Sequence, residues 1–289
     1  MSDPRSVQID LLSNLNGDVC EELAVLAQRC ISGYSDDRPV SASLVHSRLT
    51  NALTGAGPVL AVARDGQEVT GWCAVRRPEP GEARARLWGP VVEPSARRAS
   101  LGLRLLQTVV DAVQYPLVTT DVPVDRDGAG MFFTRSGWEV LDTITVLHGT
   151  PSDGPGAVTA VGITGLEAYV AAAGRRFAGL ESSFAASTLP RWRDDARFSA
   201  ETLLLDPPTG SLLLALVQRN ATGSELLVAE VWAADAGVRR RLIAQAHALA
   251  AERQVATVRA VTRQDPADFT ASGMRVTGRC LTYTLPGER

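Results

Sequence analysis

The sequence contains no lysine, because all 29 of its Lys and Arg residues are arginines. This absence excludes a phosphate-binding loop of the G-x-x-x-x-G-K-[ST] type, a Schiff-base lysine and the lysine with which protein kinases pair ATP. The sequence also lacks G-x-S-x-G and H-E-x-x-H, which mark common hydrolases and metalloproteases. Most of the common hydrolase, kinase and metalloprotease functions are therefore excluded.

Cysteine and histidine are scarce, with four and three copies in 289 residues. There is no C-x-x-C and the histidines are scattered, so we expect no metal site. Cys20 and Cys30 fall on one predicted helix, where ten residues separate them by about 15 Å. A disulfide needs Cα atoms less than about 7 Å apart. We therefore expect reduced thiols.

Long apolar runs and an excess of positive charge are also missing. No stretch approaches the roughly 18 apolar residues of a membrane helix, and residues 1–15 lack the pattern of a secretion signal. The formal net charge is −3 and the pI is about 5.7, which argues against a nucleic-acid partner. We expect a cytoplasmic protein with no membrane partner, and we interpret the run 239–241 (Arg-Arg-Arg) first as a solvated helix face and second as an anion site.

What the sequence does contain is typical of a globular protein of two ordinary domains, with 45% hydrophobic and 21% charged residues. Gly, Pro, Ser and Asp dominate residues 149–157, which predicts a linker between a domain at 1–150 and a domain at 151–289. The two halves show the same order of predicted elements, which indicates an internal duplication.

Apolar periodicity predicts an α+β fold in each half, with a mostly antiparallel sheet flanked by helices. The first half is expected to have strands at 7–15, 58–63, 68–75, 84–92, 117–122 and 138–147, and helices at 18–32, 43–53, 101–113 and 128–136. The second half is expected to have strands at 157–162, 202–205, 211–218, 226–232, 256–261 and 275–285, and helices at 166–177, 181–186, 238–253 and 266–272.

The most informative segment is 88–106, in which a strand leads through a turn of small and basic residues into a helix. Backbone N–H groups at a helix start have no intrahelical partner, and the helix dipole adds positive potential there. A pyrophosphate fits this arrangement. Ala99, Ser100 and Gly102 keep the backbone accessible, while Arg97 and Arg98 add positive charge.

This segment resembles motif A of the GNAT superfamily of acyl-CoA-dependent N-acyltransferases, written V-x-P-x-x-[RQ]-x-x-G-x-[GA]. The matching residues are Val92, Pro94, Arg97, Ser100 and Gly102, with Ser100 standing where glycine is usual. Residues 131–138 resemble the A-x-x-[LF]-Y-x-x-x-G-[FW] segment of the same family. The resemblance covers about residues 5–149 and, with the repeated element order, implies two tandem GNAT-like domains.

The resemblance implies an acetyl-CoA-dependent N-acetyltransferase that acts on an amine of a small molecule, such as an antibiotic or an amino-acid-like metabolite. Two alternatives stay open, a non-catalytic acyl-CoA-binding sensor or scaffold and a peptide or protein N-acyltransferase. In this family the fourth and fifth strands separate, and the pantetheine arm lies along the strand edge near Val92. The implied acyl-CoA site consists of Val91, Val92, Arg97, Arg98, Ala99, Ser100, Leu101, Gly102, Leu103, Asp127 and Phe133.

Several residues depart from the family pattern. Phe133 stands where many members carry the tyrosine that protonates the leaving thiolate, and a phenyl ring has no proton to donate. Pro90 falls where a backbone N–H often meets the thioester oxygen, and proline has none. Arg86 stands where some members place a glutamate base, and Asp127 replaces a common asparagine.

A general base is still needed, because the attacking amine must lose a proton. Asp121, near the end of the fifth strand, is expected to face the separated strands, with a cap on the following turn as the alternative. Glu93 at a strand end, His46 on a helix, and Asp36 and Asp37 in a loop are further acidic or basic residues that we expect to be surface groups or to lie near the acceptor.

The second half has lost the motif. Its corresponding turn is two residues shorter, contains only Gly237, and directs Asp235 toward any phosphate, although Phe269 and Gly273 repeat the Phe-x-x-x-Gly spacing of the first half. We expect this domain to be degenerate and to bind the acceptor or to form a homodimer.

Overall fold

A computed structural model of the chain describes residues 7–12, 15–31, 41–50, 59–76, 84–97, 100–113, 115–126, 128–153, 159–162, 198–206, 209–220 and 223–285. The chain divides into two compact units, unit 1 (Met1–Leu141 and Thr282–Arg289) and unit 2 (Asp142–Leu281). The division lies N-terminal to the Gly- and Pro-rich segment 149–157, and the end of the chain returns to unit 1. The expected helices at 166–177 and 181–186 lie outside the described residues.

Unit 1 has the strand order β1-β2-β3-β4-β5-β12, in which β1 to β4 pair antiparallel and β4 pairs parallel with β5. Its last strand, β12, begins in unit 2 and ends in unit 1. The elements that begin in unit 1 are β1 (Gln8–Leu12), α1 (Gly17–Ile31), α2 (Ala42–Thr50), β2 (Val59–Asp65), β3 (Glu68–Arg76), β4 (Ala85–Val92), the 3-10 turn η1 (Pro94–Ala96), α3 (Leu101–Ala112), β5 (Val118–Pro123), α4 (Ala129–Arg135) and β6 (Glu139–Gly149).

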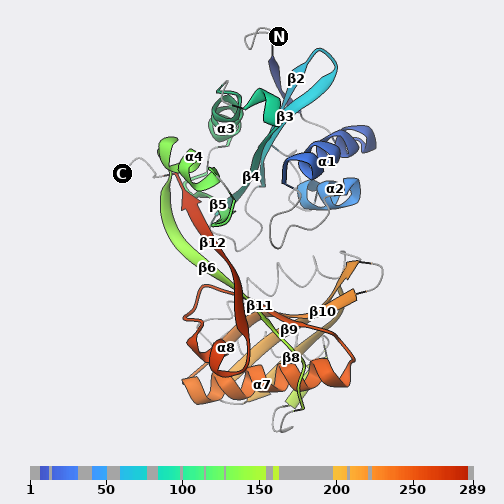
Figure 1. The fold of residues 1–289 in the computed structure, drawn as a ribbon, viewed down its shortest axis with the longest axis vertical. Helices are drawn as coiled ribbons and strands as arrows, with labels where there is room; N and C mark the ends of the chain where they lie inside the picture. Colours follow the sequence, from blue (N-terminus) through green and yellow to red (C-terminus); the bar gives the residue numbers. More distant parts are fainter. Residues whose placement is uncertain are drawn as a thin grey trace. The chain divides into compact units, whose positions relative to one another are not determined.

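Helices cover both faces of the unit 1 sheet, as Figure 1 shows for α3 on one side of β3 and α1 with α2 on the other. Two neighbouring residues of β3 establish this arrangement. A Cβ at Gly71 would lie 2.8 Å from Leu105 of α3, whereas the indole Nε1 of Trp72 donates to the carbonyl of Leu23 in α1 at 3.2 Å. Because successive side chains of a strand point to opposite faces, α1 and α3 lie on opposite faces of the sheet.

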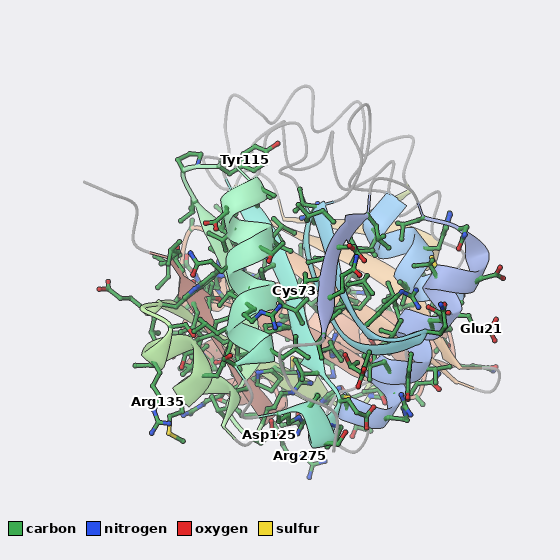
Figure 2. All side chains as sticks on the ribbon, turned by 90° about the horizontal axis from the view of Figure 1, so that it is seen from above. Glu21, Cys73, Tyr115, Asp125, Arg135 and Arg275 are labelled. Atoms are coloured by element: carbon green, nitrogen blue, oxygen red, sulfur yellow. The ribbon has the colours of Figure 1, made fainter. Side chains whose placement is uncertain are left out.

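The apolar residues of α1 that predict a helix form one buried core with β2 and β3. This core consists of Cys20, Leu23, Ala24, Leu26, Ala27, Val45, Leu49, Leu60, Val62, Val69, Trp72, Ala74 and Val91. Burial raises the pKa of the Cys20 thiol and that of the Cys73 thiol. Figure 2 shows Cys73 inside unit 1, whereas the side chains of Glu21 and Arg135 project outward. All four cysteines are in the described ranges, and none forms a disulfide.

Unit 2 repeats the topology of unit 1. In both units two antiparallel pairings are followed by a parallel one, with β8–β9–β10–β11 matching β2–β3–β4–β5, and α7 covers one face of the sheet (Figure 1). The strand order is β12-β6-β11-β10-β9-β8-β7. The elements that begin in unit 2 are β7 (Thr159–Gly162), β8 (Phe198–Asp206), β9 (Gly210–Asn220), β10 (Gly223–Ala233), α7 (Ala236–Glu252), β11 (Val258–Thr262), α8 (Ala267–Ala271) and β12 (Arg275–Thr284).

The expected α+β fold and the internal duplication are therefore confirmed. The predicted boundaries agree closely where apolar periodicity is strong, as in α1, which was expected at 18–32 and spans Gly17–Ile31. Among the helices that the structure describes, none combines the length and the apolar character needed to cross a membrane.

Candidate functional site

The separation of β4 from β5 opens a cleft in unit 1. The two strands pair only at Ala85 with Val118 and at Arg86 with Thr119, although β4 continues to Val92 and β5 to Pro123. The expected separation of the fourth and fifth strands is therefore present. In the described part of the chain, no strand pairs with this edge of β4 from Leu87 to Val92.

A β-bulge lies in β4 where the strands separate. Trp72 pairs with Val91 and Ala74 with Trp88, so Cys73 stands opposite both Gly89 and Pro90. Gly89 has a φ of +103°, and a Cβ there would lie 3.1 Å from the carbonyl oxygen of Trp72. Glycine is therefore needed at this position. The bulge interrupts the pairing of β4 with β3, which resumes at Val91, and it bends the strand, while Pro90 supplies no N–H to a ladder.

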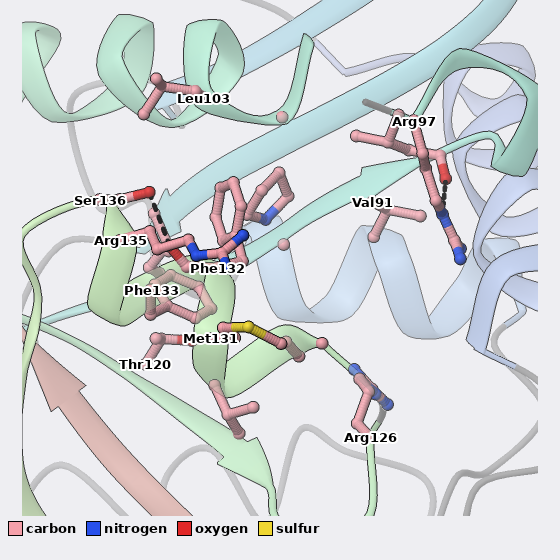
Figure 3. Close-up of a pocket in the computed structure, with 18 of the residues that line it drawn as sticks. Val91, Arg97, Leu103, Thr120, Arg126, Met131, Phe132, Phe133, Arg135 and Ser136 are labelled. Carbon is pink, nitrogen blue, oxygen red and sulfur yellow. Dashed lines mark hydrogen bonds between the residues drawn. The ribbon is translucent and has the colours of Figure 1, made fainter. Parts of the chain in front are cut away.

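The cleft has a volume of about 860 Å³ and reaches from the separated strands to the start of α3 and to α4 (Figure 3). Most residues that the sequence predicts for the acyl-CoA site line it. They are Val91, Val92, Arg97, Ser100, Leu101, Gly102, Leu103 and Phe133, together with the candidate base Asp121. Three further predicted residues, Arg98, Ala99 and Asp127, lie outside the described residues.

The start of α3 presents backbone amides at this cleft. Ser100 is the N-cap, with a φ of 57° in the left-handed region that favours glycine, and its side chain makes no capping hydrogen bond. The first helical bond runs from the N–H of Arg104 to the carbonyl of Ser100 at 3.0 Å. The amides of Leu101, Gly102 and Leu103 precede that bond, so the helix offers them no acceptor. They lie at the positive end of the helix dipole.

Gly102 keeps this turn open. A Cβ at Gly102 would lie 3.4 Å from the ring of Phe132 and 3.6 Å from Val92. Any larger side chain would therefore project between α3, α4 and β4, where the cleft is. The small residue that the motif requires at this position has a direct steric reason.

The exposed edge of β4 is partly occupied by the chain itself. The N–H of Glu93 donates to the carbonyl of Thr70 on β3 at 2.9 Å, so the N–H and C=O of Val92 point the other way, into the cleft. The Val92 carbonyl accepts from Nε of Arg97 at 3.1 Å (Figure 3) and from the Cys30 thiol at 3.4 Å. These bonds anchor the exposed Arg97 guanidinium at the rim of the cleft.

The backbone N–H of Arg97 is engaged within η1, because it donates to the carbonyl of Pro94 at 3.3 Å. The nearby Cys30 thiol has a raised pKa, chiefly through burial and further through the negative charge of Glu93, with Arg97 and Arg29 opposing the rise. This thiol is therefore protonated at neutral pH and acts as a hydrogen-bond donor to Val92.

Among the described residues that line the cleft, the charged side chains are three arginines and one aspartate. Arg97, Arg126 and Arg135 line it together with Asp121. Guanidinium groups are well suited to phosphates because they combine a permanent charge with a planar set of N–H donors. The described lining of the cleft is therefore biased toward an anionic ligand, and the Asp121 carboxylate lies on β5.

Asp121 is held by residues on both sides. Its Oδ1 accepts a hydrogen bond of 2.6 Å from the hydroxyl of Thr282, and its Oδ2 lies 3.4 Å from Nη1 of Arg86. The Asp121 side chain is 34% exposed. The carboxylate thus lies at the accessible end of the separated strands, next to Arg86.

Phe133 belongs to an aromatic cluster. Its side chain is 4% exposed, and its ring packs edge-on against Phe132 and Trp138 at centroid distances of 5.2 and 5.3 Å and stacks on Tyr283 at 5.6 Å. Its role in the fold is packing, and it offers no hydrogen-bond donor to the cleft.

The remaining acidic and basic candidates lie elsewhere. Glu93 pairs with Arg29 at 3.0 Å, and His46 is an exposed residue of α2. Asp36 and Asp37 lie outside the described residues. In the described part of the chain, no group of three or more His, Cys, Asp or Glu side chains is arranged to hold a metal ion.

Sequence reasoning missed several residues of the cleft. Cys30, Trp88, Arg126 and Arg135 line it, and Thr282 bonds to Asp121 from the far end of the chain. Cys30, Arg126 and Thr282 lie outside the two motif segments, and tertiary contacts bring them to the site. Trp88 and Arg135 lie inside the segments 88–106 and 131–138, so the sequence did hold a signal for these two.

At the corresponding turn of unit 2, side chains of the chain itself bond the backbone groups. Asp235 is the N-cap of α7, and its Oδ1 accepts from the N–H of Val238 at 2.8 Å. Nε2 of Gln264 donates to the carbonyl of Val231 on β10 at 3.1 Å. The chain thus supplies partners both at the helix start and at the strand edge.

Two arginines of the run 239–241 share one carboxylate as their partner. Arg239 and Arg240 contact the buried Asp268 carboxylate at 2.5 and 3.1 Å. Burial opposes ionisation of Asp268, but hydrogen bonds from Arg240 and Arg239 and their charges outweigh it and hold the pKa of Asp268 below its ordinary value. This run therefore differs from a simply solvated helix face, since it joins α7 to α8.

Solved structures share this fold over nearly the whole chain. A GCN5-related N-acetyltransferase from Sphaerobacter thermophilus aligns with a TM-score of 0.68 and 18% identity over 98% of this chain and 96% of that one. A tandem GNAT protein from the clavulanic acid biosynthesis pathway aligns with a TM-score of 0.70 and 16% identity over 96% and 98%.

A third similar structure is a GCN5-related glucosamine N-acetyltransferase region in a fungal multi-domain GH3 β-N-acetylglucosaminidase. It aligns with a TM-score of 0.72 and 16% identity over 96% of this chain and 38% of that one. No protein-family model and no curated protein matches the sequence. At these identities the likeness establishes the fold, and the chain has the tandem GNAT fold that its motifs predict.

Proposed function

We propose that the chain is an acetyl-CoA-dependent N-acetyltransferase that acts on an amine of a small molecule. One observation carries the proposal: the open start of α3 and the separated edge of β4 line the same cleft. A diphosphate needs the first of these features and an extended amide-containing arm needs the second. The tandem GNAT fold supports this assignment of the cleft.

The residues of the cleft suit acetyl-CoA. The amides of Leu101, Gly102 and Leu103 bind the diphosphate, and Arg97 contributes through its guanidinium because its own amide is engaged by Pro94. The N–H of Val92 bonds the pantetheine arm. Arg98, Ala99 and Asp127 remain part of the proposed site on the strength of the motif.

The reaction is direct transfer. The amine nitrogen bonds to the acyl carbon, the carbon–sulfur bond breaks, and the amine proton passes to Asp121 directly or through one water. Asp121 suits this role because it is accessible and lies where the strands separate. The leaving thiolate takes its proton from water, since Phe133 has none to give.

Unit 2 has a different role in this proposal. Its own cap at Asp235 and the Gln264 bond to Val231 leave it poorly suited to a diphosphate, so it binds the acceptor or forms a homodimer. The four cysteines outside disulfides are consistent with a reducing cytoplasm.

Isothermal titration with acetyl-CoA and a thiol-release assay with a panel of small amines test this function. We expect binding in the micromolar range and turnover that depends on one class of amine. Absence of any affinity for acetyl-CoA rules the proposal out.

A non-catalytic acyl-CoA sensor is the second candidate, and two observations favour it. Phe133 is locked in an aromatic cluster where many members of the family place an acid, and Pro90 offers no N–H to a thioester oxygen. Tight acetyl-CoA binding without turnover on small amines or on peptides supports this candidate over an enzyme.

A further inference from the structure

The last strand of the chain contributes its final residues to the catalytic unit. β12 begins at Arg275 in unit 2, but Thr282 and the residues after it belong to unit 1. There the hydroxyl of Thr282 donates to Asp121 at 2.6 Å, Tyr283 stacks on Phe133, and the hydroxyl of Thr284 donates to the carbonyl of Val118 at 3.1 Å. Three consecutive side chains of β12 thus contact β5 and α4.

The Thr282 bond fixes the orientation of the Asp121 carboxylate. Thr282 is fully buried, and a β-branched side chain has few χ1 rotamers to choose from. Its hydroxyl is therefore held in place. Arg86 approaches the other carboxylate oxygen at 3.4 Å, a longer and more exposed contact. Of these two contacts, the short one to Thr282 sets where Oδ1 lies, and Oδ2 faces Arg86.

We propose that Thr282 is a positioning residue for the acetyl transfer, and that it acts by holding Asp121 in the orientation in which it takes the amine proton. This proposal rests on the proposed function. It means that the site in unit 1 is complete only when the C-terminal end of β12 is in place.

The test compares Thr282→Val with Thr284→Val in the full chain. Each change replaces a hydroxyl by a methyl group on the same strand, but only the first removes a bond to Asp121, since Thr284 bonds the backbone of Val118 and Leu285. We expect T282V to lower kcat about tenfold, with unchanged acetyl-CoA affinity. T284V is expected to retain the wild-type kcat, and T282S to restore it because serine keeps the hydroxyl.

Two further variants separate positioning from loss of structure. If Thr282 acts through Asp121, adding T282V to Asp121→Asn causes no further loss of kcat, although T282V alone does. Circular dichroism and acetyl-CoA affinity verify that each variant is folded.

Equal kcat values for T282V and T284V, or additive losses in the double variant, overturn the role of Thr282. Wild-type protein that binds acetyl-CoA but acetylates no amine overturns the proposed function instead, and the role of Thr282 with it. The two failures are distinguished by the wild-type rate.

Discussion

The turns that lead into α3 and α7 occupy equivalent places in two copies of one fold, but their amides meet different partners. At α3 the cap residue Ser100 makes no side-chain capping bond. At α7 the carboxylate of Asp235 takes the N–H of Val238. A helix start whose backbone N–H groups are bonded by its own chain has fewer N–H groups to offer an anion. If the start of α3 binds a diphosphate as proposed, the absence of a side-chain cap there is what distinguishes the binding turn from its counterpart in unit 2.

The edges of β4 and β10 show a second difference. The carbonyl of Val92 on β4 is bonded by Arg97 and Cys30, and the arginine brings a positive charge to the rim. The carbonyl of Val231 on β10 is bonded by Gln264, a neutral side chain. Unit 1 thus pairs its strand edge with a cation suited to phosphate, whereas unit 2 pairs its edge with an amide.

Transplanting the unit 2 cap into unit 1 is expected to have the largest effect. In Ser100→Asp, a carboxylate competes for the amides of α3 and repels the diphosphate. We expect acetyl-CoA affinity to fall at least about 100-fold, or about 2.7 kcal/mol, by isothermal titration. Ser100→Asn is the matched control, since asparagine has a similar size and also adopts positive φ. Equal losses in both variants would show that the added capping oxygen, rather than its charge, lowers the affinity.

The second-largest effect is expected when the carboxylate that pairs with two arginines of unit 2 is removed. Asp268→Asn leaves the half-buried Arg239 without its counter-charge, and we expect the free energy of unfolding to fall by about 2 kcal/mol at pH 7. Urea denaturation measures it. Asp265→Asn is the control, because the carboxylate of Asp265 accepts from the amide of Ala267 at 2.9 Å and asparagine can do the same.

The wild type and D268N also test how the stability depends on pH. Since the pKa of Asp268 is lowered in the folded state, its stabilising contribution is present above the unfolded value of about 3.9 and is lost as the pH falls through the folded value. The difference in unfolding free energy between wild type and D268N should therefore be full at pH 7 and shrink below about pH 4. A difference that grows toward low pH contradicts this assignment.

The smallest effect is expected from Asp235→Ala. Loss of the N-cap of α7 should lower the free energy of unfolding by about 1 kcal/mol, measured by urea denaturation. Asp235→Asn keeps a capping oxygen and should lose no more than a few tenths of a kcal/mol. Acetyl-CoA affinity should stay at the wild-type value in both. A second acetyl-CoA site in D235A would mean that the cap alone keeps unit 2 from binding acetyl-CoA.

Local patterns were sufficient for much of the fold and for part of the site. The apolar stripe of α1 and the strand–turn–helix order before Leu101 depend on neighbours in sequence, and both are found where they were predicted. The equivalence of the two halves also follows from element order. In contrast, the separation of β4 from β5 was expected only from the family resemblance.

Contacts between distant segments could not be predicted. The bond between Thr282 and Asp121 joins residues 161 positions apart, and the pairing of Arg86 with Asp121 depends on the register of β4 and β5. The burial of Asp268 between two arginines likewise requires α7 and α8 to be packed. These features follow from tertiary geometry, which no local pattern encodes.

Amide hydrogen exchange followed by NMR, with and without acetyl-CoA, tests the central claim most directly. We predict that exchange slows at Leu101, Gly102 and Leu103 when acetyl-CoA binds, because those N–H groups acquire phosphate acceptors. Exchange at Gly237 and Val238 should not change. Unaltered exchange at the start of α3 on saturation with acetyl-CoA, or equal protection at the start of α7, would contradict the account.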